Sequence, residues 1–372
     1  MKTAAIISEY NPFHLGHKYQ VNRLRADGFD VIIAIMSGSV VQRGELACAD
    51  KFSRGRAAIA CGVDIVIELP APFSCSSAEY FAYAGVFAAE MLHADVLSFG
   101  SECGDLDALR KHSYLQNTAS AGSGAARAEL EGTEFLSNDI LGIEYLRAIR
   151  KLKARIEPLT HKREGGGYLS QDSDTLFPSA SAIRKLVFEK DLAKISACMP
   201  RESYDVLLPE LLTADKHKRD EVMFDMLCAK LSFSSSDSLS HLAFLSGGLA
   251  QRLKNAADHA SSLEELYSLA ATKVYTNGRI RRASVCALCE IEAEAIKKAP
   301  EYLAALAASR AGRKYLSDNS FDVEICSNVR QKKAYSSFEY EKKLDTLYSL
   351  VHLKETGKRE NYLIKAPYMH QS

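Results

Sequence analysis

Short apolar segments of strand length recur through the first half of this chain, and a stretch with helical character follows each of the first four. The apolar segments are Ala4–Ile7, Val31–Met36, Asp64–Leu69, Val96–Phe99 and, more weakly, Arg155–Thr160. The helical patterns lie at Lys18–Ala26, Phe52–Cys61, Ala78–His93, Leu106–Thr118 and Asp139–Lys153. Buried strands that alternate with helices are typical of a parallel sheet covered by helices on both faces. The pattern therefore predicts an α/β fold with a doubly wound parallel sheet.

Strand-like segments fade after Pro200, where helical patterns take over. These patterns cover Asp220–Leu231, Ser238–Asn255, Ser262–Thr272, Ser284–Lys298 and Glu301–Ser309. A chain of 372 residues is long enough for two domains. We therefore expect an α/β domain over residues 1–195 and a mainly helical domain over residues 196–372.

Composition narrows the class of protein. Nine cysteines, scattered and odd in number, argue against a disulfide framework and for a reducing cytoplasm. The CxxC pair Cys286 and Cys289 lies inside a helical pattern with no second pair, which favours buried helix cysteines over a metal or redox site. No apolar run approaches the about 18 residues of a membrane span, so we expect no membrane partner. Basic and acidic residues balance at 47 each, so a nucleic acid would have to be bound by a local patch.

The stretch EYNPFHLGHKYQ, residues 9–20, follows the first predicted strand directly. A turn needs only Asn, Pro or Gly, and it does not need two histidines beside Gly16. The glycine lets a ligand approach the backbone, and the helix that begins near His17 offers free N–H groups. His14 and His17 can donate to phosphate oxygens, and Lys18 adds a positive charge. The stretch therefore points to phosphoryl or nucleotidyl transfer; the alternative is a capped turn with two solvent-facing histidines.

Other loops at predicted strand ends carry compatible residues. MSGSVVQRGELA after the second strand holds hydroxyls together with Gln42 and Arg43, and Gly100 follows the fourth strand. Asn138 and Asp139 stand where an N-cap is expected, and SASAIRK opens a further helix with small hydroxyl residues before its arginine. Because ligands of such sheets bind beyond the carboxyl ends of the strands, we expect these loops to converge on one site.

The same segments resemble a known family. HLGH resembles the HxGH signature of the nucleotidyltransferase superfamily, and SASAIR resembles its second signature. The longer strings IISEYNPFHLGH, SGSVVQRGELA, GVDIVIELP, LSFGSECGD, SNDILGIEYL and SASAIRK follow the order found in bacterial tRNA(Met) cytidine acetate ligases. KVYTNGRIRR and SRAGRKYLS extend the similarity to about residue 330.

The resemblance implies a nucleotidyltransferase-like Rossmann fold and a reaction. ATP activates acetate as acetyl-adenylate, and the acetyl group passes to N4 of the wobble cytidine of elongator tRNA(Met). His14, His17 and Lys18 are implied as the catalytic residues. Implied ATP contacts are Ile7, Ser8, Glu9, Tyr10, Asn11, Pro12, Phe13, His14, Leu15, Gly16, His17, Lys18, Tyr19, Gln20, Gly100, Asn138, Arg163 and Ser181. Mg²⁺ is expected from the chemistry of ATP. No motif in the sequence identifies its protein ligands, and none indicates the oligomeric state.

KVYTNGRIRRAS, in the helical half, is the candidate RNA surface. It gathers Lys273, Tyr275, Arg279, Arg281 and Arg282 within ten residues of chain. Basic groups beside an aromatic ring suit phosphate contact and base stacking. The alternative is the solvated start of a helix with ordinary surface charge.

Two other functions compete with the ligase. A small-molecule adenylyltransferase would share the HxGH loop, but it needs only a compact single domain, and the long helical half argues against it. A non-catalytic tRNA-binding protein would have no evident use for intact His14, Gly16 and His17.

Overall fold

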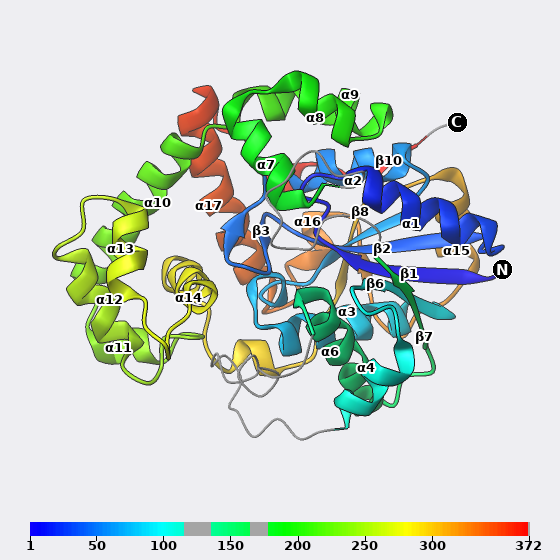
Figure 1. Cartoon of the computed structure of the whole chain (residues 1–372), viewed down its shortest axis with the longest axis horizontal. Helices are drawn as coiled ribbons and strands as arrows, with labels where there is room; N and C mark the ends of the chain where they lie inside the picture. The colour runs from blue at the N-terminus through cyan, green and yellow to red at the C-terminus, as the bar shows by residue number, and fades with distance from the viewer. Residues whose placement is uncertain (115–134, 164–177, 371–372) are drawn as a thin grey trace.

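A computed structural model of the chain describes residues 1–114, 135–163 and 178–370 (Figure 1). Its main sheet contains eight strands in the order β10-β8-β5-β2-β1-β6-β7, with β9 paired to β8. The five predicted strands are confirmed as β1 (Thr3–Ser8), β2 (Val31–Ser37), β5 (Ile65–Leu69), β6 (Val96–Ser101) and β7 (Glu157–Lys162). These five strands run parallel to one another.

Helices cover both faces of this sheet, because neighbouring residues of each strand point to opposite sides. In β1, Ala5 packs in the core that contains helices α3 and α6, whereas Ala4 and Ile6 pack in the core that contains α1 and α2. Figure 1 shows these two pairs on opposite sides of the strands. The helices are α1 (Leu15–Ala26), α2 (Lys51–Ala60), α3 (Ala78–Met91), α4 (Leu106–Ser113) and α6 (Ser137–Leu152). The predicted doubly wound architecture is therefore confirmed. The last residues of the fourth predicted helix, 115–118, lie outside the described residues.

The strand order reverses between β1 and β6. From β1 the chain proceeds outward through β2 and β5, and then it crosses back to β6 and β7 on the other side of β1. Loops on the two sides of such a reversal diverge, which opens a crevice at the carboxyl ends of the strands. That crevice lies directly beyond Ser8 and Ser101, the last residues of β1 and β6.

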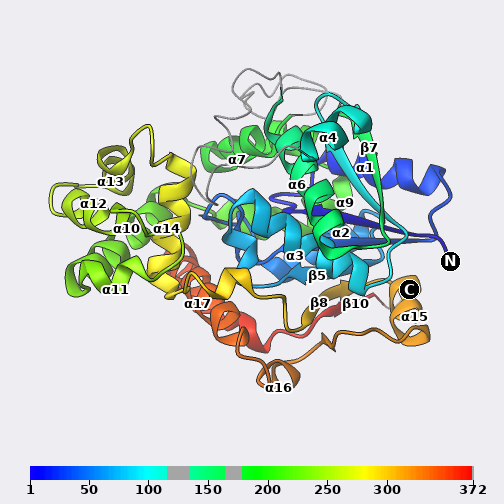
Figure 2. The same ribbon diagram turned by 90° about the horizontal axis from the view of Figure 1, so that it is seen from below.

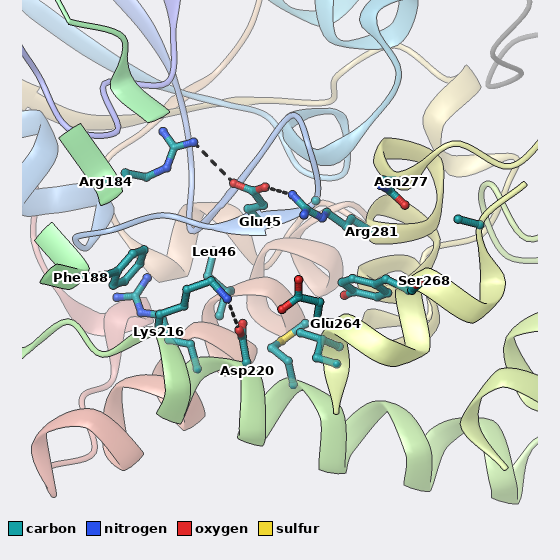
Figure 3. Close-up of a pocket in the computed structure, with 16 residues that line it drawn as sticks. Glu45, Leu46, Arg184, Phe188, Lys216, Asp220, Glu264, Ser268, Asn277 and Arg281 are labelled. Atoms are coloured by element: carbon teal, nitrogen blue, oxygen red, sulfur yellow. Dashed lines mark hydrogen bonds and ion pairs between the residues drawn. The ribbon is translucent and has the colours of Figure 1, made fainter. Parts of the chain in front are cut away.

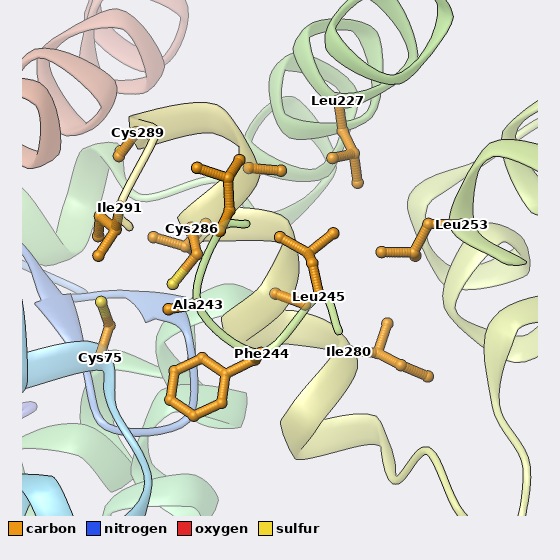
Figure 4. Packing of buried hydrophobic residues seen from close by; sticks show 14 of the residues in the cluster. Cys75, Leu227, Ala243, Phe244, Leu245, Leu253, Ile280, Cys286, Cys289 and Ile291 are labelled. Carbon is orange, nitrogen blue, oxygen red and sulfur yellow. The ribbon is translucent and has the colours of Figure 1, made fainter. Parts of the chain in front are cut away.

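The chain from residue 180 to residue 289 is mainly helical in the described structure. Its helices are α7 (Ala180–Glu189), α8 (Leu192–Cys198), α9 (Arg201–Thr213), α10 (Lys216–Phe233), α11 (Ser236–Ser240), α12 (Leu249–Ala257), α13 (Leu263–Ala270) and α14 (Asn277–Cys289). Leu227, Leu253 and Ile280 meet in one apolar core (Figure 4). Cys286 and Cys289 are buried and free in the same core, as the helical pattern around them favoured.

The prediction of a helix at Glu301–Ser309 is wrong. This segment contains β8 (Leu303–Ala308), which pairs antiparallel with β5, and β10 (Tyr368–Met369) pairs with β8 in turn. The sequence LAALAA has high helix propensity, but all six residues are buried against the sheet, and this burial overrides propensity. The chain thus returns to the sheet after its helical region, and the division at residue 195 stays a prediction.

The last elements place a long helix between the sheet and the helical region. They are α15 (Arg310–Asp318), β9 (Ile325–Cys326), α16 (Val329–Lys332) and the long helix α17 (Phe338–Thr356). Near the other end of the chain, a short hairpin of β3 (Val40–Val41) and β4 (Glu45–Leu46) follows β2. In Figure 2, α17 lies between α14 and the strands. No helix in the described parts of the chain is long and apolar enough to cross a membrane.

A buried cluster of charges ties α17 to the sheet. Lys51 Nζ of α2 lies 2.7 Å from Glu68 Oε2 of β5, and it lies 3.0 Å from Glu341 Oε1 and 2.8 Å from Asp345 Oδ2, both on α17. Lys332 Nζ adds a second cation at 2.6 Å from Glu341 Oε1. Burial raises the pKa of Glu68 to about 7, whereas Lys51 and Lys332 overcome burial and lower the pKa of Glu341 to about 2.

We expect Lys51→Met to destabilise the protein by about 3 to 5 kcal/mol, because it leaves buried carboxylates without their shared cation. Urea unfolding at neutral pH measures the change. Lys314→Met, at an exposed position of α15, is the matched control and should change stability by less than about 0.5 kcal/mol. A Lys51→Met protein as stable as the parent would contradict a stabilising role for the cluster.

Candidate active site

The loop between β1 and α1 is held by a reciprocal pair of histidine hydrogen bonds. His14 is the N-cap of α1, and its Nδ1 accepts from the N–H of Gly16 at 3.1 Å. The backbone N–H of His14 donates to Nδ1 of His17 at 3.2 Å. This reciprocal arrangement satisfies two N–H groups at the helix start that would otherwise lack partners. It also explains why α1 begins three residues before the predicted Lys18.

These hydrogen bonds fix the tautomer of both rings. Since each Nδ1 accepts a hydrogen bond, the proton of each neutral imidazole sits on Nε2. Burial, followed by the charges of Arg163 and Arg184, lowers the pKa of His14 to about 3. Burial, followed by His14 and Arg163, holds the pKa of His17 well below its usual value. The two rings stack with centroids 3.8 Å apart. Because both pKa values are lowered, the rings form a pair of neutral donors at neutral pH.

A cavity of about 290 Å³ opens at the crevice between β1 and β6. It brings together many of the predicted ATP contacts: Ile7, Ser8, Glu9, Tyr10, Asn11, His14, His17, Gln20, Gly100, Asn138 and Arg163. A Cβ on Gly100 would lie 2.9 Å from Cγ of Arg163, so only glycine lets this arginine approach β6 so closely. The strand-end loops converge as the sequence predicted.

Several predicted contacts do not line this cavity. They are Pro12, Phe13, Leu15, Gly16, Lys18, Tyr19 and Ser181. Lys18 Nζ donates to the carbonyl of Cys61 at 3.0 Å, where it anchors α1 to the end of α2. Lys18 follows His17 by one position, about 100° further round the helix, so its side chain leaves toward a different neighbour. Phe13 is fully buried in the core, and Ser181 Oγ accepts from Arg184 at 3.2 Å.

Asn138 lines the cavity, but the expectation that it caps the helix is wrong. Helix α6 begins at Ser137, with Leu136 as the N-cap residue. The N–H of Leu136 donates to Asp139 Oδ2 at 3.1 Å. Asp139, in the first turn of the helix, therefore supplies the acceptor for the N–H of the N-cap residue. Asn138 Nδ2 donates to Glu102 Oε1 at 2.5 Å, and this hydrogen bond orients the amide beside the cavity.

The cavity also contains residues that were outside the predicted ATP contacts. Gln42 and Arg43 come from the hairpin, and Arg184 comes from the first turns of α7. Arg184 Nη1 donates to the carbonyl of Asn11 at 3.1 Å, which binds α7 to the loop after β1. The motifs SGSVVQRGELA and SASAIRK were the signals for these residues. Phe81 and Tyr145 complete an apolar wall from α3 and α6, and no local pattern marked them.

Glu9 is the one carboxylate among the described residues that line this cavity. Its Oε1 accepts from the backbone N–H of Gln42 at 3.0 Å, and burial raises its pKa. The positive charge of Arg184 is the largest influence that lowers this pKa. The remainder of the glycine-rich segment after Arg163, residues 164–177, lies outside the described residues.

The predicted RNA patch is largely engaged within the protein. Arg279 donates to the carbonyls of Phe244 at 3.2 Å and Ser246 at 2.9 Å, and Arg281 pairs with Glu45 of the hairpin. The guanidinium of Arg282 lies over the ring of Phe244, and burial lowers its pKa to about 10. Tyr275 OH donates to the carbonyl of Gly247, whereas Lys273 is exposed. An RNA role for the patch stays a prediction.

Comparison with known proteins places the chain among nucleotidyl transferases. The model of the HIGH Nucleotidyl Transferase family matches residues 1–362. A tRNA(Met) cytidine acetate ligase of Caldicellulosiruptor bescii is 33% identical over 362 residues, which cover 89% of this chain and 88% of that protein. The protein of the same name from Pediococcus pentosaceus is 32% identical over 365 residues, 96% of this chain and 97% of that protein.

Two solved structures share the whole fold. The apo crystal structure of Thermotoga maritima TmcAL matches with a TM-score of 0.89 at 25% sequence identity, and the match covers 100% of both chains. The same protein bound with alpha-thio ATP matches with a TM-score of 0.85 at the same identity and coverage.

The neutral histidine pair makes stability depend on pH. Folding lowers the pKa of His14 to about 3, so below the usual value of about 6.5 the unfolded chain binds the extra proton first. Stability should therefore fall as pH drops from 6.5, by up to about 1.4 kcal/mol per pH unit for this group. His14→Asn keeps a capping oxygen but cannot titrate, so urea unfolding between pH 7.5 and 5 should show a shallower decline.

The control for this experiment is His259→Asn, at an exposed position after α12. It should leave the decline of stability with pH as steep as in the parent. Equal slopes for the parent and His14→Asn would mean that His14 does not stay neutral in the folded protein.

Proposed function

The chain belongs to the HIGH nucleotidyl transferase family and, within it, to the tRNA(Met) cytidine acetate ligases, and from this premise we propose that it acetylates RNA with ATP and acetate. In this proposal the enzyme forms acetyl-adenylate and transfers the acetyl group to N4 of the wobble cytidine of elongator tRNA(Met). The nine free cysteines suit the reducing cytoplasm, in which we place the activity.

The observation that carries the proposal is the pair of neutral imidazoles at the start of α1. His14 and His17 line the crevice at the strand reversal, and both rings keep their proton on Nε2. Arg163 and Arg184 line the same cavity. Donors and cations placed around one crevice suit the phosphates of ATP, whose negative charge is redistributed during nucleotidyl transfer. We therefore assign catalysis to His14 and His17, and we place ATP along the cavity.

The proposed reaction has two steps. An acetate oxygen attacks the α-phosphorus of ATP, the bond to the β-phosphate oxygen breaks, and pyrophosphate leaves with the electron pair. The cytidine N4 then attacks the acetyl carbonyl carbon, the bond to the AMP oxygen breaks, and N4 loses one proton. The protein's part is to hold the reactants in line and to stabilise charge, since neither step needs a covalent enzyme intermediate. Mg²⁺ commonly binds through substrate phosphates, so we propose that it enters with ATP.

Lys18 has a different role in this proposal from the one that the motif implied. Its ammonium group is used to join α1 to the carbonyl of Cys61, so it supports the helix that carries both histidines. We propose it as a positioning residue. Glu9, with its raised pKa and its place beside Arg184, is suited to accept the proton that N4 releases.

We expect His17→Ala to lower acetate-dependent exchange of pyrophosphate into ATP by about a hundredfold or more, because one donor to the transition state is lost. Circular dichroism checks that the fold is kept. His259→Ala, at an exposed position outside the described cavity, is the matched control and should exchange at the parent rate. Near-normal exchange by His17→Ala would remove His17 from the catalytic residues.

The exposed Lys273 gives the cleanest test of the RNA patch, because its neighbouring arginines also hold the protein together. We expect Lys273→Glu to weaken tRNA binding several-fold and to reduce the slope of log affinity against log salt by about one. Lys314→Glu on α15 makes the same charge change elsewhere. Identical binding by the two variants across a salt series would place the RNA surface away from Lys273.

A further inference from the structure

A second cavity, of about 600 Å³, lies where the sheet meets the helical region (Figure 3). We call it the seam cavity. Its walls come from the hairpin after β2 and from helices α7, α10, α13 and α14, so neither half of the chain forms it alone. The residues on which its chemistry depends are Glu45, Arg184, Phe188, Lys216, Ser268 and Tyr267.

Arg184 belongs to both cavities. Its Nη1 donates to the carbonyl of Asn11 on the active-site side, and its Nη2 lies 3.6 Å from Glu45 Oε2 on the seam side. The other carboxylate oxygen of Glu45 pairs with Arg281 of α14, and Figure 3 shows this line of charges along one wall. A group held in the seam cavity against Glu45 is therefore separated from the active-site cavity by one side chain.

The remaining walls offer what a single nucleotide needs. Phe188 and Tyr267 present half-buried aromatic rings from α7 and α13, and nucleobases stack on such rings. The carboxylate of Glu45 can accept from the exocyclic amine of cytosine. Lys216, exposed at the start of α10, pairs with Asp220 at 2.5 Å on the same wall, and its ammonium group keeps further N–H donors for a phosphate of the backbone.

We propose that the seam cavity binds the acceptor nucleotide of the RNA, a cytidine turned out of its loop, with its amine directed to Glu45 and its base against Phe188. Bases of single-stranded loops can be splayed out and stacked on aromatic side chains in this way. The inference rests on the proposed function for the identity of the RNA. It assigns to the seam cavity the task of holding the acceptor base next to Arg184, the side chain that both cavities share.

The test couples a change in the protein to a change in the RNA. The probes are the anticodon stem-loop of elongator tRNA(Met) and the same stem-loop with an abasic ribose at the wobble position. In the absence of ATP and acetate, the parent should bind the cytidine form about fivefold to tenfold more tightly. Phe188→Leu keeps an apolar side chain but removes the ring, so it should bind both forms with nearly equal affinity.

Two further variants secure the result. Ser268→Trp places a large side chain in the cavity from an exposed position of α13, so it should also abolish the preference even if Phe188→Leu folds poorly. Phe233→Leu, where the side chain is 91% exposed, is the matched control and should keep the parent's preference. A preference that survives in Ser268→Trp, or a parent that binds both RNAs equally or neither of them, would overturn the assignment.

Failure of this inference can be told apart from failure of the proposed function. Acetate-dependent exchange of pyrophosphate into ATP by the parent, and labelled N4-acetylcytidine in tRNA treated with it, test the reaction itself. Acetylation with no preference for cytidine in the binding assay would keep the reaction and reject the seam cavity as the base site.

Discussion

The guanidinium of Arg54 is the interaction on which both cavities depend. It is fully buried on α2, and it donates to the carbonyls of Ala49, Glu9, Ser37 and Gly38. Three of these carbonyls lie at the carboxyl ends of β1 and β2, where the ladder of strand hydrogen bonds has ended and buried acceptors need another donor. Glu9 leads into the loop that ends at His14, which lines the active-site cavity, and Gly38 leads into the hairpin that carries Glu45, which lines the seam cavity. The side chain of Arg54 therefore fixes the start of both segments.

Helix α2 also joins the sheet to α17, the last long helix of the chain. Lys51, three residues before Arg54, binds carboxylates of α17, and α17 packs beside α10 and α14. Buried charges such as these are costly unless they are paired, so they hold α17 in one position against the sheet. The position of the helical region, and with it the width of the seam cavity, is thereby tied to the same helix that orders the strand ends.

Features that depend on neighbouring residues could be predicted from the sequence. The five parallel strands follow from apolar runs bounded by turn residues, and the placement of His14 and His17 at a helix start after the first strand follows from their position beside Gly16. Features that depend on distant partners could not. LAALAA forms strand β8 because β5 offers an unpaired edge, and Lys18 leaves the active site because the carbonyl of Cys61 lies within its reach. The arginines of KVYTNGRIRR pair with the hairpin and a distant loop, and no local pattern indicated this.

By itself the sequence determined the α/β class, the order of the strand-end loops and the family to which the chain belongs, because each of these is written in residues close together along the chain. Only the tertiary structure decided which side chains share a cavity, that Arg184 stands between two cavities, and that both histidines are neutral donors. The physical reason is that a pKa and a hydrogen-bond partner are set by burial and by charges within a few ångströms. Those surroundings come from segments far apart in the chain, such as Asn11 and Arg184, which are 173 residues apart and are brought into contact only by folding.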